Sequence, residues 1–209
     1  MTVVKRPSKR AEKAQETRRR IIQAATELFV ADGYGATNLQ DVADQAGVAV
    51  QTIYFVFGNK RALLKELVDV TIAGDTEPVA TMERPWFTDA VAMRTAPDML
   101  AEYVPGSSAV LARVAPIMRV LESAVANDPE VSALWPPDED LRYVVQRAAA
   151  EALVTKSGRR RGLTVDEAAD LLYGILSPEL YLLFVRDRGW SHDRWVEWAT
   201  QTLRTQLCA

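Results

Sequence analysis

The sequence predicts an all-α protein with a three-helix helix-turn-helix domain at its N-terminus and a larger helical domain behind it. Apolar residues recur every three or four positions along most of the 209-residue chain, and no segment alternates like a β-strand. Capping residues and glycines divide the first third into short helices. The first 65 residues hold 11 Lys/Arg and 6 Asp/Glu, whereas the remainder holds 14 and 22. Positive charge is therefore concentrated at one end.

We expect a basic, flexible arm in residues 1–15, a helix-turn-helix domain in residues 16–62 and the helical domain in residues 63–209. The arm contains five cations and no apolar stripe: Lys5, Arg6, Lys9, Arg10 and Lys13. Such an arm can fold along or into a DNA groove on binding. A solvated tail that only aids solubility is the alternative.

The first helix is expected to begin near Glu16 and to end at Gly33, because glycine tolerates the left-handed backbone of a helix C-terminus. It carries the run Arg18, Arg19 and Arg20, at least one of which should face DNA. Thr37 is expected to cap the second helix in a capping box with Gln40, three residues on. The buried stripe of that helix is Leu39, Val42, Ala43 and Ala46.

The third helix is expected to run from about Val50 to Phe55, after a turn at Gly47-Val48-Ala49. Its inward residues are Ile53 and Phe57. The residues left exposed or partly exposed are Val50, Gln51, Thr52, Tyr54 and Phe55. In a major groove, Gln can bond adenine edges, Thr and Tyr can contact phosphates, and an apolar side chain can contact a thymine methyl group.

Asn59 is expected to cap a fourth helix that runs to about Val70 and joins both domains. Lys60 lies in its first turn, where a free cation is unfavourable against the helix dipole and a nearby phosphate would remove the penalty. The inward residues of this helix are Leu63, Leu64, Leu67 and Val68.

These residues resemble the DNA-binding domain of the tetracycline-repressor (TetR) family. The matching pattern is Ile22-x-Ala24-Ala25-x-x-Leu28-Phe29, Gly33-x-x-x-Thr37, Val42-Ala43-x-x-Ala46-Gly47-Val48 and Thr52-Ile53-Tyr54-x-x-Phe57-x-x-Lys60-x-x-Leu63. The resemblance covers roughly the first third of the chain. Two positions depart from the family pattern: Ala49 replaces a frequent Ser, and Val56 replaces a common His or Tyr.

The resemblance implies that Thr37, Tyr54 and Lys60 contact the DNA backbone. It implies that Gln51, Thr52 and Phe55 face the groove. Arg18, Asn38 and Val50 are added because they lie in or beside the same helices. The predicted DNA-binding set is therefore Arg18, Thr37, Asn38, Val50, Gln51, Thr52, Tyr54, Phe55 and Lys60. For the rest of the chain, the resemblance implies an all-helical domain for ligand binding and dimerisation.

In that domain, residues 75–88 are expected to form a connection that contains Pro78 and Pro85. Helices are then expected at about residues 89–95 and 97–103, from Ser107 or Ser108 to Asn127, and briefly after Asp128-Pro129. Further helices are expected at about 138–156, 164–188 and 191–206. Pro105-Gly106 is expected to break the helix that runs to about Tyr103, and Pro116 is expected to kink or divide the helix that follows. Pro178 either kinks the 164–188 helix near Leu176 or ends it, and both alternatives stay open.

The last two helices hold more apolar residues than one helix pair can bury. A symmetric dimer through a four-helix bundle would cover the surplus. The predicted interface residues are Leu172, Leu176, Leu180, Phe184, Trp195 and Trp198. Two recognition helices about one helical turn apart (~34 Å), or further, would then contact a palindromic site.

Aromatic and methionine side chains of the second domain are candidates for an effector pocket, with ordinary core packing as the alternative. The candidates are Trp86, Met93, Met99, Leu100, Tyr103, Met118, Trp135, Tyr143 and Tyr173. The surplus of acidic residues favours an apolar or cationic effector.

We expect no cofactor, no metal site and no enzymatic activity, because a single His192 and a single Cys208 provide no catalytic or zinc-binding set. The lone cysteine is typical of a reducing cytoplasm. The sequence contains no apolar run of 18 residues, so no membrane span is expected. The preferred hypothesis is a cytoplasmic repressor that binds double-stranded operator DNA as a homodimer and is released by a small molecule. The alternatives are a ligand-independent regulator or activator, and an enzyme with its site in the second domain.

Overall fold

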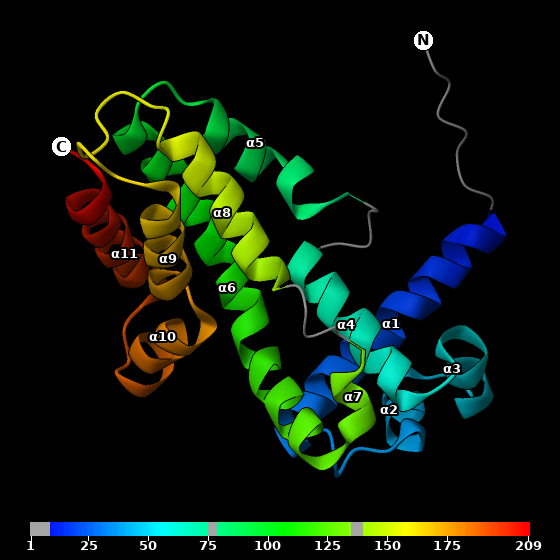
Figure 1. Cartoon of the computed structure of the whole chain (residues 1–209). Helices are drawn as coiled ribbons and strands as arrows, with labels where there is room; N and C mark the ends of the chain where they lie inside the picture. Colours follow the sequence, from blue (N-terminus) through cyan, green and yellow to red (C-terminus); the bar gives the residue numbers. More distant parts are fainter. Residues whose placement is uncertain (1–8, 75–78, 135–139) are drawn as a thin grey trace. The chain divides into compact units, whose positions relative to one another are not determined.

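The computed structural model describes residues 9–74, 79–134 and 140–209. These residues fold into helices joined by turns, and their β-type contacts are isolated bridges such as Arg159 with Cys208. Their contacts separate two compact units (Figure 1). The first unit runs to Asp69 and also contains Arg119–Leu134; the second contains Val70–Met118 and the chain from Trp135 onward. The domain limits 16–62 and 63–209 remain a prediction.

The first unit contains α1 (Lys9–Asp32), α2 (Leu39–Ala46), α3 (Val50–Phe57), most of α4 (Lys60–Ala73), the end of α6 (Ala96–Asn127) and α7 (Pro129–Ser132). Helix α1 begins at Lys9 and not near Glu16, because Lys, Arg, Ala, Glu and Gln between them are all strong helix formers. The part of the expected arm that contains Lys5 and Arg6 lies outside the described residues. Helix α1 buries five apolar side chains: Ile21, Ile22, Ala24, Ala25 and Phe29.

The cap of α2 corrects the sequence prediction. Asn38, and not Thr37, is the N-cap: its Oδ1 accepts hydrogen bonds from the amides of Gln40 (2.8 Å) and Asp41 (3.0 Å), and the Asp41 carboxylate accepts from the Asn38 amide. The hydroxyl of Thr37 is instead buried and donates to the carbonyl oxygen of Gly33 at 2.9 Å. The expected cap of α4 is confirmed, since Asn59 Oδ1 accepts from the amide of Ala62.

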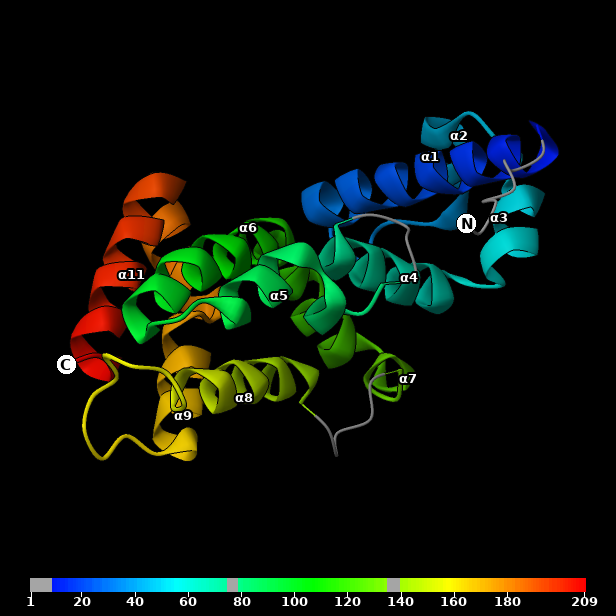
Figure 2. The same ribbon diagram turned by 90° about the horizontal axis from the view of Figure 1, so that it is seen from above.

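The second unit contains a short 3₁₀ turn (Thr81–Glu83), α5 (Pro85–Ala92), most of α6, α8 (Leu141–Leu153), α9 (Val165–Ile175), α10 (Pro178–Leu182), a π-helical turn η2 (Leu183–Asp187) and α11 (His192–Leu207). Figure 2 shows α8 beside α9 in this unit. Thr164 and Ser191 cap α9 and α11 as expected. Helix α5 begins at Pro85, earlier than expected, because proline fits the first turn of a helix.

Helix α6 is continuous over 32 residues, so the predicted break at Pro105-Gly106 is wrong. Both Pro105 and Pro116 lie on its exposed side, where water can satisfy the carbonyl groups of the preceding turn. On the opposite face of the helix, side chains are buried both before and after each proline. Each large apolar side chain buried there contributes roughly 1.5–3 kcal/mol, which offsets the roughly 3 kcal/mol that an interior proline costs.

At Pro178, by contrast, the structure has a true helix break. Ser177 caps the new helix α10, because its hydroxyl accepts from the amide of Leu180 at 3.1 Å, and Pro178 occupies the first helical position. Val165–Asp187 is also, among the described residues, the stretch long and apolar enough by composition to cross a membrane. A core helix pair of a globular protein has the same composition, and this stretch is interrupted at Ser177.

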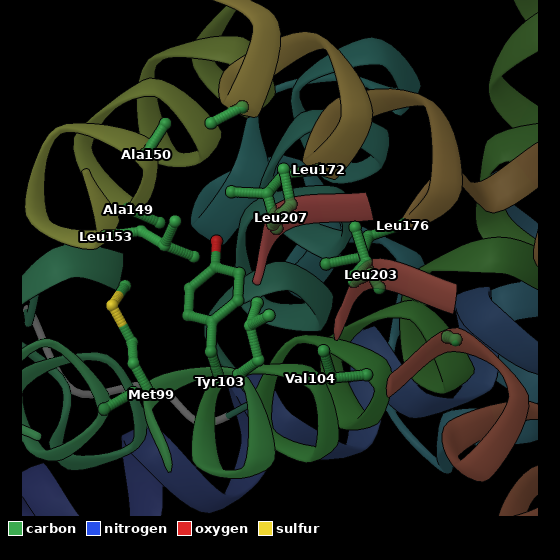
Figure 3. Close-up of a cluster of buried hydrophobic side chains, with 14 of the residues drawn as sticks. Met99, Tyr103, Val104, Ala149, Ala150, Leu153, Leu172, Leu176, Leu203 and Leu207 are labelled. Carbon is green, nitrogen blue, oxygen red and sulfur yellow. The ribbon is translucent and has the colours of Figure 1, made fainter. Parts of the chain in front are cut away.

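Tyr103 of α6 lies in the middle of the second unit's core, among side chains from α6, α8, α9 and α11 (Figure 3). Its hydroxyl donates to Gln146 Oε1 at 2.9 Å, and burial raises the pKa of that hydroxyl well above its usual range. Trp86 and Phe87 of α5 stack near it, with ring centroids 5.7 and 6.0 Å away. The Trp86 indole lies against the backbone of Gly106, so α6 needs a residue without Cβ at that point.

A pair of glycine substitutions tests this packing. Gly174→Ala in α9 should raise the free energy of unfolding by about 0.5–1 kcal/mol, because an added Cβ meets nothing within 4 Å and alanine favours a helix interior. Gly106→Ala should lower the free energy of unfolding by about 1–3 kcal/mol, because the Cβ would lie 2.8 Å from the Trp86 ring. Urea denaturation measures both, and shifts of the same sign would contradict the packing.

Candidate functional site

Helix α3 has one buried side and one exposed side. Ile53 is fully buried and Phe57 is 8% exposed, whereas Tyr54 is 54% and Phe55 is 91% exposed. Gln51 is exposed as well, and Val50 and Thr52 are partly exposed. The orientation expected from the sequence is therefore confirmed. The exposed side offers an amide, hydroxyls and an aromatic ring, which are groups that contact bases and phosphates in a major groove.

The turn before α3 is fixed by its backbone and by Arg20. Gly47 adopts a left-handed conformation (φ 64°), and the Val48 amide donates to the Ala43 carbonyl oxygen at 3.0 Å. The Arg20 guanidinium of α1 donates to the carbonyl oxygens of Ala46 (3.0 Å from Nε) and Gly47 (2.9 Å). A cation at these carbonyls complements the negative end of the α2 dipole. Arg20 thus fixes the C-terminal end of α2 and the turn that leads to α3.

Two more arginines of α1 have partners inside the first unit. Arg18 forms an ion pair with Glu66 at 2.7 Å, and its guanidinium lies 4.9 Å from the centre of the Phe57 ring. Arg19 pairs with Glu16. The expectation that one of these arginines faces DNA stays a prediction, and any phosphate contact by Arg18 would compete with Glu66.

Lys60 joins the first turn of α4 to the loop between α1 and α2. Its ammonium donates to the carbonyl oxygen of Tyr34 and lies 4.2 Å from the centre of the Tyr34 ring. Partial burial lowers the pKa of Lys60, against an opposing effect of Asp128. The helix-dipole penalty expected from the sequence is therefore relieved in part by protein groups, and a phosphate contact by Lys60 remains a prediction.

Sequence reasoning missed the cluster around Arg61. The Arg61 guanidinium bonds Asp128 at 2.8 Å and pairs with Glu130 at 2.5 Å, which ties α4 to the N-terminus of α7 within the first unit. The hydrogen bond from Arg61 lowers the pKa of the Asp128 carboxyl. No local pattern indicates a pair 67 residues apart in sequence, so only the folded structure reveals it.

Two residues of the predicted DNA-binding set have other roles. The Thr37 side chain is 3% exposed and its hydroxyl is engaged at Gly33 and Leu28, so the expected phosphate contact through this hydroxyl is wrong for this structure. Asn38 is exposed, but its side-chain oxygen caps α2. The remaining exposed candidates on α3 lie together on one helix face.

The effector candidates are only partly brought together. Met99, Leu100 and Tyr103 are buried in the core, and Trp86, Met93 and Tyr143 pack against it. Tyr173 pairs with Tyr143 in a T-shaped contact at 5.5 Å and donates to Asp140, nearer the surface. Met118 is not a member of this core cluster, and Trp135 lies outside the described residues.

The predicted dimer residues divide into two groups. Leu172, Leu176 and Trp195 are buried in the chain's own core, so their side chains cannot meet a partner and this part of the prediction is wrong. Leu172 and Leu176 lie among core side chains of α6, α8 and α11 (Figure 3), and Trp195 belongs to the same buried cluster. Leu180, Phe184 and Trp198 are partly exposed. Leu183, which the sequence prediction omitted, is 48% exposed in the π-helical turn between them.

Phe184 lies within an aromatic cluster at the same end of the unit. Its ring centroid is 4.4 Å from that of Trp190, 5.0 Å from that of Trp198 and 5.7 Å from that of Trp195. The Arg194 guanidinium lies 4.1 Å from the centre of the Trp190 ring. Phe184, Trp190 and Trp198 are partly exposed, and they lie on the buried Trp195 near Leu183.

Residues 21–67 match the family model described as bacterial regulatory proteins, tetR family. The chain is 47% identical over 58 residues to the HTH-type transcriptional regulator TtgR of Pseudomonas putida. That match spans 28% of this chain and 28% of TtgR. The region that matches the family model therefore runs from within α1 to within α4.

Two solved structures share the fold over most of the chain. A transcriptional regulator from Saccharomonospora viridis, in complex with choline, has a TM-score of 0.68 at 18% identity and covers 93% of this chain and 99% of its own. The regulator FadR from Bacillus subtilis, in complex with stearoyl-CoA, has a TM-score of 0.65 at 21% identity, with coverage of 88% and 96%. At such identities, the likeness establishes the fold.

Proposed function

We propose that this chain, whose residues 21–67 match the TetR family model, is a non-enzymatic repressor that binds a palindromic operator as a homodimer. We propose further that a small molecule bound in the second unit releases it. The observation that carries the proposal is the exposed side of α3, where Gln51, Tyr54 and Phe55 stand away from a fully buried Ile53. Such a regulator acts inside the cell, where the DNA is.

The distribution of charge supports DNA binding. The first 65 residues have a net charge of +5 and the rest of the chain has a net charge of −8. Phosphate contacts supply much of the affinity for DNA and make it depend on salt, whereas base contacts supply specificity. The basic N-terminal third therefore supports attraction to the duplex, and Gln51 on α3 supports selection of a sequence.

A salt-dependent binding titration tests the DNA-binding proposal. A site selected from a random library should bind more tightly than scrambled DNA, and affinity for both should fall as salt rises. Gln51→Ala should reduce the preference for the selected site by roughly 5- to 150-fold, because a bidentate contact to adenine contributes about 1–3 kcal/mol of discrimination. Gln23→Ala, an exposed glutamine on α1, is the matched control. Equal binding of selected and scrambled DNA would contradict the proposal.

An exposed apolar surface supports the homodimer. Only 39% of the most apolar window in Val165–Asp187 is buried inside the chain. Leu183 is half exposed, and Leu180, Phe184 and Trp198 around it are partly exposed. A second copy related by a twofold axis would cover this surface with the same surface of its own chain. Two copies of α3 could then contact the two halves of a palindrome.

A single charge tests this interface. Leu183→Lys should convert the dimer to a monomer in sedimentation velocity, because a buried ammonium without a partner is strongly unfavourable. Leu141→Lys is the control, since Leu141 is 64% exposed at the start of α8, on another helix. A Leu183→Lys variant that sediments as the same dimer would place the interface elsewhere.

Polar atoms within the second unit's core support an effector site. Among the described residues, Ser108 Oγ and Trp195 Nε1 are buried without a hydrogen-bond partner. An unsatisfied buried donor costs about 1–3 kcal/mol, and a ligand that accepts a hydrogen bond would remove that cost. Among the described residues, no acidic or basic residue is buried as a whole, although the Nε atom of the partly exposed Arg160 is buried. We therefore propose an uncharged, largely apolar effector with a hydrogen-bond acceptor, in contrast to the choline of the Saccharomonospora viridis regulator.

Thermal unfolding with three naphthalene probes tests the effector class. Uncharged 2-naphthol should raise Tm, whereas 2-naphthoate and a naphthylmethyl trimethylammonium ion should not, because the core offers no opposite charge. Ser108→Ala should shrink the shift caused by 2-naphthol, and Ser123→Ala, an exposed serine on the same helix, should not. Stabilisation by the cation alone would favour a cationic effector instead.

Release requires that the effector bind one conformation more tightly than the other. Helix α4 carries Lys60 and Arg61 at its start, and its last residues belong to the second unit. A change in the second unit could therefore reach α3 through α4. A ligand-independent regulator or an activator is the alternative, and an operator affinity that no effector changes would favour it.

A further inference from the structure

Phe55 is the most exposed large apolar side chain among the described residues, with 91% of its surface in solvent. It lies on a helix whose position is fixed on both sides, since Ile53 is fully buried and Phe57 is 8% exposed. Burying a phenylalanine ring contributes roughly 1.5–3 kcal/mol, and this chain forgoes that contribution in its folded state. The ring is thus available to a partner at a defined place.

Gln51 shares this face of α3 with Phe55. The two residues are four positions apart, so their side chains lie one turn apart, about 6 Å along the helix axis. Base pairs stack about 3.4 Å apart, so a helix placed along the major groove would put the two side chains roughly two base steps apart. A glutamine and a phenylalanine at this spacing can contact different base pairs in the same half-site.

The chemistry of the ring limits what it can recognise. In the major groove, bases present hydrogen-bond donors and acceptors and one apolar group, the C5-methyl group of thymine. A phenyl ring offers these groups at most a weak N–H···π contact, which does not replace the hydrogen bonds to water that they would lose. The methyl group is therefore the base-edge feature that Phe55 can contact favourably.

We propose that Phe55 makes operator recognition depend on a 5-methyl group of a pyrimidine. This inference rests on the proposed DNA-binding function of α3. Phe55 distinguishes thymine from uracil, which differs by that methyl group alone, and 5-methylcytosine from cytosine. In an operator with cytosine at that position, methylation of the cytosine consequently raises the affinity of this regulator.

The test uses the full chain and an operator selected from a random library. Each thymine of a half-site is replaced in turn by deoxyuridine, and affinity is measured at one salt concentration. Replacement in one half-site should weaken binding about fourfold, and the same replacement in both half-sites about fifteenfold, as expected for one buried methyl group each. At that position, 5-methylcytosine should bind about fourfold more tightly than cytosine.

Variants assign the effect to the ring. Phe55→Ala should bind the thymine and deoxyuridine operators equally, and its exposure means that the fold does not depend on the ring. Phe55→Leu should keep part of the difference, and Gln23→Ala, at an exposed residue of α1 outside the proposed contact surface, should keep all of it.

The protein could bind the selected operator selectively and yet keep the same affinity whichever thymine is replaced by deoxyuridine. That result would overturn this inference and leave the proposed function intact. The inference fails equally if Phe55→Ala still discriminates the methyl group. Insertion of the ring between base pairs, which would also overturn it, would show as indifference to the methyl group together with bending of the DNA. If no library sequence binds better than random DNA, the proposed function itself fails.

Discussion

The burial of Ile53 and Phe57 is the constraint on which the rest of the first unit depends. Helix α3 has eight residues, and isolated helices of that length are unstable in water. Its conformation must therefore come from packing, and these two side chains are the ones it buries. Once they are fixed, helical geometry determines that Gln51 and Phe55 face outward. The same packing that makes the helix stable also presents its contact surface.

Charged side chains of the first unit reinforce this arrangement. Arg20 bonds the carbonyl groups that end α2, Lys60 bonds the Tyr34 carbonyl, and Arg61 joins α4 to α7 through Asp128. Each of these cations already has a protein partner. The positive potential of the unit and the geometry of its turns thus depend on the same residues. Binding to phosphate then depends more on the polar side chains of α3 and on the basic residues at the start of α1.

Local patterns in the sequence predicted the order of the helices and the orientation of α3, because caps, glycine turns and apolar spacing act within a few residues. They failed where two neighbouring residues suited the same role equally well, or where contacts with residues far away in sequence determined the structure. Thr37 and Asn38 are adjacent capping residues, and only the burial of Thr37 selects Asn38. Pro105 was expected to end a helix, but the helix continues past it because its opposite face is buried. Leu172 and Trp195 were assigned to an interface because apolar residues alone do not show which face the chain itself covers.

The placement of α3 in a major groove is the central claim, and dimethyl sulfate protection on a selected operator tests it most directly. The reagent methylates guanine N7 in the major groove and adenine N3 in the minor groove. Binding through α3 predicts protection of guanine N7 in both half-sites, with adenine N3 between them still reactive. Protection of adenine N3 with guanine N7 fully reactive would contradict this placement.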